Sequence, residues 1–182
     1  MFKRLRARRR AEKAAQQAAR QGDTQALIDL LGQPDPKIRA SAANACMLLP
    51  AGSAPPSLVG SLLRAGADPD AKVRYHTILA LGSLRASEAS DLFLRALSDD
   101  DRWVRMAAAV AIGWMPDPRA VGVLRQLLSD EEPFVRQFAA LALGEIGDET
   151  SLPAIQALLR TEQDAEVRKW AQEALDKLSN PS

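Results

Sequence analysis

The chain has 182 residues and a net charge of +1, and 47% of its residues are hydrophobic although only 4% are aromatic. Alanine and leucine supply most of the apolar side chains, which favours close-packed helices over a β-sandwich rich in aromatic and β-branched residues. A single cysteine excludes an intrachain disulfide and a cysteine metal cluster, and no apolar run reaches the roughly 18 to 20 residues that cross a bilayer. Because nothing at the N-terminus resembles a signal peptide, we expect a cytoplasmic, all-α protein.

The first predicted element is a basic helix in residues 1–22. Residues 1–20 hold eight basic residues and one acid, which leaves 16 basic and 22 acidic residues in the rest of the chain. The pattern predicts a helix that caps the region following it, or a degenerate half-repeat, with a narrow apolar face formed by Ala11, Ala14, Ala15, Ala18 and Ala19. A second hypothesis is that the basic side chains touch an anionic membrane or nucleic acid through Lys3, Arg4, Arg6, Arg8, Arg9 and Arg10.

From residue 23 onward one pattern recurs five times. A Val-Arg or Ile-Arg pair ends at successive arginines that are 35, 31, 31 and 32 residues apart, namely Arg39, Arg74, Arg105, Arg136 and Arg168. Four residues before each arginine stands an acid, which can cap a helix: Asp35, Asp70, Asp101, Glu132 and Asp164. Apolar positions then recur at helical spacing, so each arginine lies near the start of an amphipathic helix.

A second amphipathic segment precedes each acid, so every unit reads as helix A, a tight turn and helix B. The five units cover about residues 23–50, 55–85, 89–116, 119–147 and 150–178 of one repeat domain, residues 23–182. Three helices B carry a glycine at one register, Gly82, Gly113 or Gly144, which predicts close packing between helices because glycine within a helix is otherwise unfavourable.

The units, above all "DEEPFVRQFAALALGEIGDETSLPAIQALL", resemble the short HEAT-like repeat first described in phycobilisome bilin lyases. The motifs of tetratricopeptide and ankyrin repeats, which have similar periods, are absent. The resemblance implies a right-handed α-solenoid, HEAT-like or armadillo-like, of five helical pairs plus the N-terminal helix. It also implies that acid and arginine form a structural ladder, paired within a unit or bridging to the next.

Candidate chemistry is sparse. His76 is the one histidine and has no carboxylate or second imidazole at ligand spacing; the metal-dependent hydroxylases of this fold carry His-Glu pairs, whereas Thr77 follows here. Cys46 occupies a core position, which predicts a buried and inert thiol. We therefore predict no catalytic residue, no cofactor and no metal.

The predicted function is a non-catalytic scaffold or adaptor that binds a peptide or helix of a protein partner. Helices B of such solenoids line the concave side, and the positions one, five and nine after each arginine face away from the core. In the second to fourth units these positions hold the predicted partner-binding residues Tyr75, Leu79, Met106, Val110, Trp114 and Leu141, with Trp114 as the central anchor. The competing interpretation is that neighbouring helices cover these side chains.

Two alternative functions stay open from the sequence. One is a subunit of a bilin-lyase-like enzyme, which pigment transfer to an acceptor protein would reveal. The other is an adaptor associated with a membrane or nucleic acid through the basic N-terminal helix.

Overall fold

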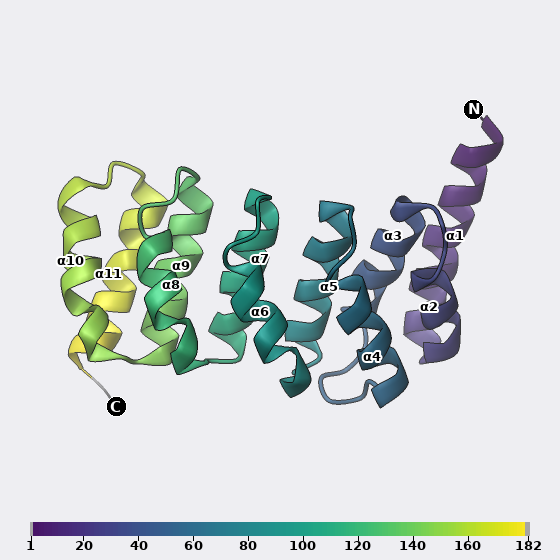
Figure 1. Cartoon of the computed structure of the whole chain (residues 1–182), viewed down its shortest axis with the longest axis horizontal. Helices are drawn as coiled ribbons and strands as arrows, with labels where there is room; N and C mark the ends of the chain where they lie inside the picture. The colour runs from purple at the N-terminus through teal and green to yellow at the C-terminus, as the bar shows by residue number, and fades with distance from the viewer. Residues whose placement is uncertain (1, 181–182) are drawn as a thin grey trace. The chain divides into compact units, whose positions relative to one another are not determined.

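The computed structural model describes the backbone of residues 2–180 and the side chains of residues 5–180. Within this range the chain forms eleven α-helices, three short 3₁₀ turns and no strand (Figure 1). No helix of the described part is long and apolar enough to span a bilayer. The predicted all-α fold is confirmed.

Along the chain, an N-terminal helix is followed by five helical pairs. The N-terminal helix is α1 (Phe2–Gln21). The pairs are α2 (Thr24–Leu31) with α3 (Pro36–Cys46), α4 (Pro56–Ala65) with α5 (Ala71–Ser83), α6 (Ser90–Ala96) with α7 (Arg102–Trp114), α8 (Val121–Leu127) with α9 (Pro133–Ile146), and α10 (Leu152–Thr161) with α11 (Ala165–Ser179). The even-numbered helices are thus the predicted helices A, and α3 to α11 with odd numbers are the predicted helices B.

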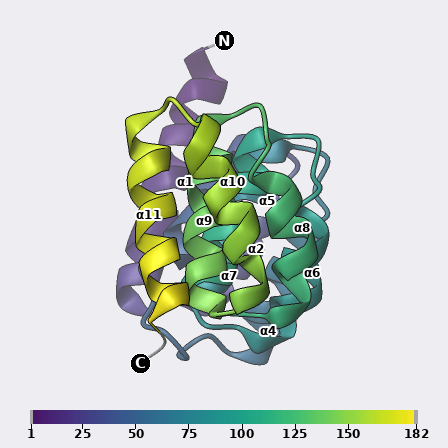
Figure 2. The ribbon, with the colours of Figure 1, turned by 90° about the vertical axis from the view of Figure 1, so that its left-hand side faces the viewer.

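The chain divides into two compact units, Met1–Leu92 and Phe93–Ser182, with the boundary inside α6. In the first unit, α3 packs against α1, α2 and α5, and α4 packs against α2 and α5. In the second unit, α9 packs against α7, α8 and α11, and Figure 2 shows α10 beside α11. Each unit therefore contains a layer of helices B that contact one another, as expected where repeats touch their neighbours.

The valine before the arginine anchors each of the last four helices B in the core. Val73, Val104, Val135 and Val167 are fully buried, together with the alanine six residues after each arginine. Ile38, the residue at the same position in α3, is partly exposed. The periodic apolar positions thus form the core of both units, as the repeat pattern predicted.

Helix α1 has the place of a helix B. It packs against α3 as the helices B pack against one another. Its residues Ala15, Ala18 and Ala19 are buried, whereas Ala14 is exposed. Ala14 stands six residues after Arg8. At the same position after their own arginines, the helices B of the five pairs carry a buried alanine. The packing of α1 against α3 is that expected of a half-repeat, and the role of α1 as a cap stays a prediction.

Candidate partner-binding site

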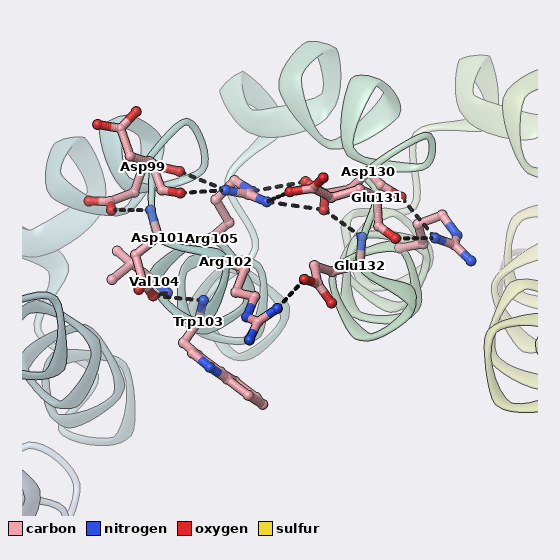
Figure 3. Close-up of polar contacts among 11 residues, drawn as sticks. Asp99, Asp101, Arg102, Trp103, Val104, Arg105, Asp130, Glu131 and Glu132 are labelled. Atoms are coloured by element: carbon pink, nitrogen blue, oxygen red, sulfur yellow. Dashed lines mark hydrogen bonds and ion pairs between the residues drawn. The ribbon is translucent and has the colours of Figure 1, made fainter.

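The acids four residues before the arginines cap the helices B in four of the five pairs. Asp101 is representative, because its Oδ1 accepts hydrogen bonds from the backbone N–H groups of Trp103 and Val104 at 2.9 and 3.2 Å (Figure 3). Asp35, Asp70 and Asp164 cap α3, α5 and α11 in the same way. Glu132 makes no such bond to α9 and instead accepts from Arg102 of α7, so the capping prediction is wrong at this residue.

A different set of acids pairs with the arginines. In the second unit, Nε and Nη2 of Arg105 donate to the two carboxylate oxygens of Asp130 at 2.8 and 3.1 Å (Figure 3). Arg136 binds Glu162 at 2.6 and 3.0 Å, and in the first unit Arg39 binds Asp68 at 2.7 and 2.8 Å. The ladder thus bridges one repeat to the next, and these three bidentate pairs do not use the acid four residues upstream.

The ladder acid stands six residues before the arginine of its own repeat. That position reads Gln33, Asp68, Asp99, Asp130 and Glu162. Its acidic character in four repeats is the sequence signal that could have identified it. The carboxylate of the capping acid instead accepts hydrogen bonds from the free backbone N–H groups at the start of its own helix.

Each ladder arginine also donates hydrogen bonds to backbone carbonyls in the turn of its own repeat. Nη1 of Arg105 donates to the backbone carbonyls of Asp99 and Asp100 at 3.0 and 3.1 Å. The side chains of Asp68, Asp130 and Glu162 are at most 8% exposed. The hydrogen bonds from Arg136 lower the pKa of Glu162 to about 2, because they stabilise its charged form against the cost of burial. These buried pairs are therefore structural.

The predicted partner-binding residues fall in both units. Tyr75 and Leu79 lie on α5 of the first unit; Met106, Val110, Trp114 and Leu141 lie on α7 and α9 of the second. Leu79 is only 9% exposed and Met106 only 8%, so the expectation of an exposed surface is wrong for these two. Adjacent helices B pack closely, and a side chain near the seam between them is covered.

The remaining four predicted residues keep access to solvent. Trp114 is 37% exposed, and Tyr75, Val110 and Leu141 are half-buried. Their role in partner binding stays a prediction. The competing interpretation, in which all six side chains are packed within the chain, does not hold for Trp114.

The sequence analysis missed two aromatic residues at the surface, the exposed Trp103 and the half-buried Phe134. Trp103, which is 47% exposed, stacks on Phe134 with ring centroids 4.4 Å apart and an interplanar angle of 7°. Both precede a ladder arginine by two residues, where the other repeats carry Lys37, Lys72 or Glu166. Reading this position along the repeats would have revealed them.

Helical geometry aligns these aromatics with the predicted residues. At 100° per residue, Trp103, Val110 and Trp114 fall within about 40° of one another on α7. Phe134 and Leu141 share the same direction on α9. We call these five residues the aromatic stripe. For each helix B, we call a second set of positions the open face. It comprises the residue two positions before the ladder arginine and the residues one, two, five and nine positions after it.

Ion pairs border the aromatic stripe. Arg102 pairs with Glu132 (Figure 3). The guanidinium carbon of Arg102 lies 5.9 Å from the centroid of Trp103, the ring that stacks on Phe134. On α11, Nζ of Lys177 lies 2.6 Å from a carboxylate oxygen of Glu145 on α9. An apolar centre with a charged rim is the usual composition of a protein interface.

The candidate reactive residues occupy structural positions. Burial raises the pKa of the Cys46 thiol to about 12, and its Sγ donates to the carbonyl of Ala42 at 3.2 Å, so the thiol is unreactive at neutral pH. His76 is half-buried with its ring 4.8 Å from that of Tyr75, and burial lowers its pKa. In the part of the chain that the structure describes, no three His, Cys, Asp or Glu residues are grouped to hold a metal ion.

The basic residues predicted to touch anionic surfaces do not act as one set. Nε of Arg8 donates to Asp35 at 2.6 Å, so this arginine contributes to the packing of α1 on α3, and its contact with an anionic surface stays a prediction. Arg6, Arg9 and Arg10 are exposed. The side chains of Lys3 and Arg4 lie outside the described residues.

The paired helices, the periodic core and the inter-repeat ladder define a helical repeat protein, and comparison with known proteins agrees. The sequence model of the family described as HEAT repeats matches residues 61–127 and 112–176, which together exceed half of the chain. The protein therefore belongs to the HEAT repeat family. A search of curated protein sequences gives no match.

Solved structures show the same fold at low sequence identity. The Escherichia coli protein YibA is 23% identical with a TM-score of 0.73, over 93% of this chain and 60% of that one. A designed armadillo repeat protein in complex with the peptide (KR)4 is 20% identical with a TM-score of 0.72, over 96% and 92%. The complex of CpcE and CpcF of phycocyanin lyase from Nostoc is 22% identical with a TM-score of 0.64, over 84% and 98%. The α-solenoid fold of the HEAT and armadillo type is thereby established.

Proposed function

We propose that the protein is a non-catalytic adaptor that binds a helix or extended peptide of a partner protein along the aromatic stripe of its second unit. The observation that carries the proposal is the stacked pair of Trp103 and Phe134, because a tryptophan that is 47% exposed costs solvation free energy unless a partner covers it.

The stripe has the size of a peptide-binding surface. Trp103 and Trp114 are eleven residues apart on α7, which corresponds to about 16 Å along the helix axis. A partner helix of about three turns would match this length, with an apolar side chain on each turn. The two tryptophans at the ends are the residue type that most often dominates binding energy at interfaces.

The similar folds support a protein partner. The designed armadillo repeat protein forms a complex with a peptide, and CpcE and CpcF of phycocyanin lyase form a complex with each other. Both are similar to this chain in fold alone, so they support the class of partner and leave its identity to experiment.

Affinity capture with matched variants tests the proposal. The tagged full-length protein would be used on an extract of its source cells, alongside the double variant Trp103→Ala with Trp114→Ala and the control Leu48→Ala. Leu48 is 54% exposed and lies in the first unit, so the control removes a comparable apolar side chain elsewhere.

We expect proteins recovered with the wild type to be reduced at least about tenfold with the double variant, equivalent to roughly 1.4 kcal/mol, and unchanged with the control. Retention of every partner by a double variant that melts at the wild-type temperature would rule out the aromatic stripe.

A further inference from the structure

The two units differ in charge more than the balanced whole suggests. Residues 1–92 contain 14 basic and 8 acidic residues, a net charge of +6, whereas residues 93–182 contain 10 and 15, a net charge of −5. A cluster of this excess positive charge on one surface of the first unit would attract an anionic ligand.

Helix α1 places four cations on its open face. Ala15 and Ala18 stand seven and ten residues after Arg8, where the helices B carry core apolar residues, and their burial places Arg8 at the position of a ladder arginine. Arg8 itself pairs with the capping acid Asp35, because Gln33 occupies the ladder position of that repeat. With Arg8 taken as the equivalent of a ladder arginine, four basic residues of α1 fall at open-face positions. They stand two residues before Arg8 and one, two and five residues after it. These residues are Arg6, Arg9, Arg10 and Lys13.

The neighbouring helices extend this charge. Lys37 on α3 and Lys72 on α5 stand two residues before their ladder arginines, on the same face. Together the six cations form what we call the basic face: Arg6, Arg9, Arg10, Lys13, Lys37 and Lys72. The charge is thus spread over three helices and is not confined to an N-terminal tail.

The cations of the basic face are available for a ligand. All six side chains are exposed, and among residues 5–180 none of them forms an ion pair. No acid occupies an open-face position on α1, α3 or α5, and Glu12, the one acid of α1, lies outside these positions. Repulsion between six unpaired cations is relieved when an anionic partner binds.

We propose that the basic face binds the phosphate backbone of a nucleic acid. Arg6 and Lys13 are seven residues apart, about 10 Å along α1, which matches about three phosphates of one strand at 3.4 Å each. Neighbouring helices are spaced by about 8 to 10 Å, so the face extends roughly 20 Å from α1 to α5. Three guanidiniums suit phosphate oxygens because each can donate two parallel hydrogen bonds.

The side chains between the cations favour a phosphate backbone over a peptide or a bilayer. On α3 they are Ala40, Ser41 and Asn44, and on α5 Tyr75 is half-buried and Leu79 is buried. Leu48, just after the end of α3, is an exposed apolar side chain, but it stands alone and does not form an apolar stripe with these residues. A bound peptide or an inserted membrane helix needs exposed apolar anchors, whereas backbone binding to nucleic acid needs charge alone. The proposal uses residues of the first unit only and does not depend on the aromatic stripe.

Fluorescence anisotropy with the full-length protein tests this proposal. The probes are a labelled single-stranded oligonucleotide of about 20 residues and the corresponding duplex, each titrated at roughly 50 mM salt. Two charge reversals probe the face: Arg9→Glu with Arg10→Glu on α1, and Lys37→Glu with Lys72→Glu on α3 and α5.

The matched control is Arg95→Glu with Arg160→Glu. These two arginines are exposed and lie on helices A, α6 and α10, so the control changes the net charge by the same amount away from the basic face. Circular dichroism would verify that each variant is folded.

We expect each face variant to weaken binding of at least one probe at least about tenfold and the control to change it less than about twofold. For the wild type, raising the salt from about 50 to 200 mM should weaken binding more than about a hundredfold, because several phosphate contacts release counterions.

Four outcomes would overturn the proposal: no binding of either oligonucleotide at low salt, a control as damaging as the face variants, unchanged binding by the folded Lys37 and Lys72 variant, or tighter binding of poly-glutamate or of vesicles containing phosphatidylserine than of either oligonucleotide. The last two outcomes would assign the charge to an N-terminal tail and to a protein or membrane partner, respectively.

Discussion

In the first unit, the position two residues before the ladder arginine carries Lys37 and Lys72, whereas in the second unit it carries Trp103 and Phe134. The ladder itself is the same in both units, because Arg39 with Asp68 and Arg136 with Glu162 make matching bidentate pairs between successive repeats. The repeat therefore uses different positions for stability and for binding. Buried and capping positions hold the scaffold, while open-face positions vary and define what each unit can bind.

Replacing a ladder arginine has the largest expected effect, and the effect should be equal in the two units. Arg39→Ala and Arg136→Ala each leave a nearly buried carboxylate without its partner, so we expect each to lower the free energy of unfolding by about 3 kcal/mol. Arg8→Ala breaks a pair whose side chains are 34% and 26% exposed, and should cost less than about 1 kcal/mol. Urea denaturation of the three variants measures this order. A large loss in only one unit would contradict a shared scaffold.

Close packing in the second unit provides the next test. A Cβ atom added to Gly144 would lie 2.9 Å from Cα of Ala174 on α11, so Gly144→Ala should cost about 2 kcal/mol through overpacking. The control is Gly113→Ala, whose Cβ atom would meet no atom closer than 4.0 Å and which should gain up to about 1 kcal/mol of helix propensity. Melting temperatures should therefore move in opposite directions. Similar shifts for both variants would show that α9 and α11 are not in close contact.

Acid should weaken the ladder over a defined range of pH. The folded-state pKa of Glu162 is about 2, below its ordinary value of 4.5, so its stabilising contribution is complete above pH 4.5 and is lost as the pH falls towards 2. We expect a contribution on the order of 3 kcal/mol. Burial would raise the pKa of Asp68 in the first unit, but hydrogen bonds from Arg39 and the N–H of Asp70 outweigh it and the pKa is lowered.

Unfolding free energies measured between these pH values should decline more steeply for the wild type than for Glu162→Gln. An equally steep decline in that variant would show that Glu162 is not the group responsible.

The smallest expected effect concerns Cys46 in the first unit. Because the thiol is buried and its pKa is raised to about 12, a thiol reagent at neutral pH should label it only after denaturation. Mass spectrometry of the native and the urea-treated protein distinguishes the two states. Labelling of the native protein at the rate of a free thiol would mean that the α3 region opens readily, which would make the first unit the less stable of the two.

Much of the scaffold follows from the sequence. Each repeat places an acid, a Val-Arg pair and an alanine at one spacing, and helix formation and capping depend on residues within a few positions of one another. For this reason the five helical pairs, the four aspartate caps and the buried position of Cys46 were predictable. The tight contact at Gly144 was also predictable, because an unfavourable residue recurring within a helix indicates a constraint on packing. The same prediction is wrong at Gly113, where an added Cβ atom would meet no atom closer than 4.0 Å.

The ladder partners, the exposure of the open face and the packing of α1 were decided by tertiary structure. Which acid reaches an arginine depends on the distance between successive repeats, and this is why Asp68, Asp130 and Glu162 were not distinguished from the capping acids. A helical wheel gives the direction of Met106 on its own helix but not the neighbours that cover it. The place of Trp103 in the repeat can be read from the sequence, whereas its exposure and its stacking on Phe134 depend on how α7 and α9 pack. Periodicity specifies a helix because its hydrogen bonds are local, but contacts between helices arise from residues distant in the sequence and depend on how the repeats pack.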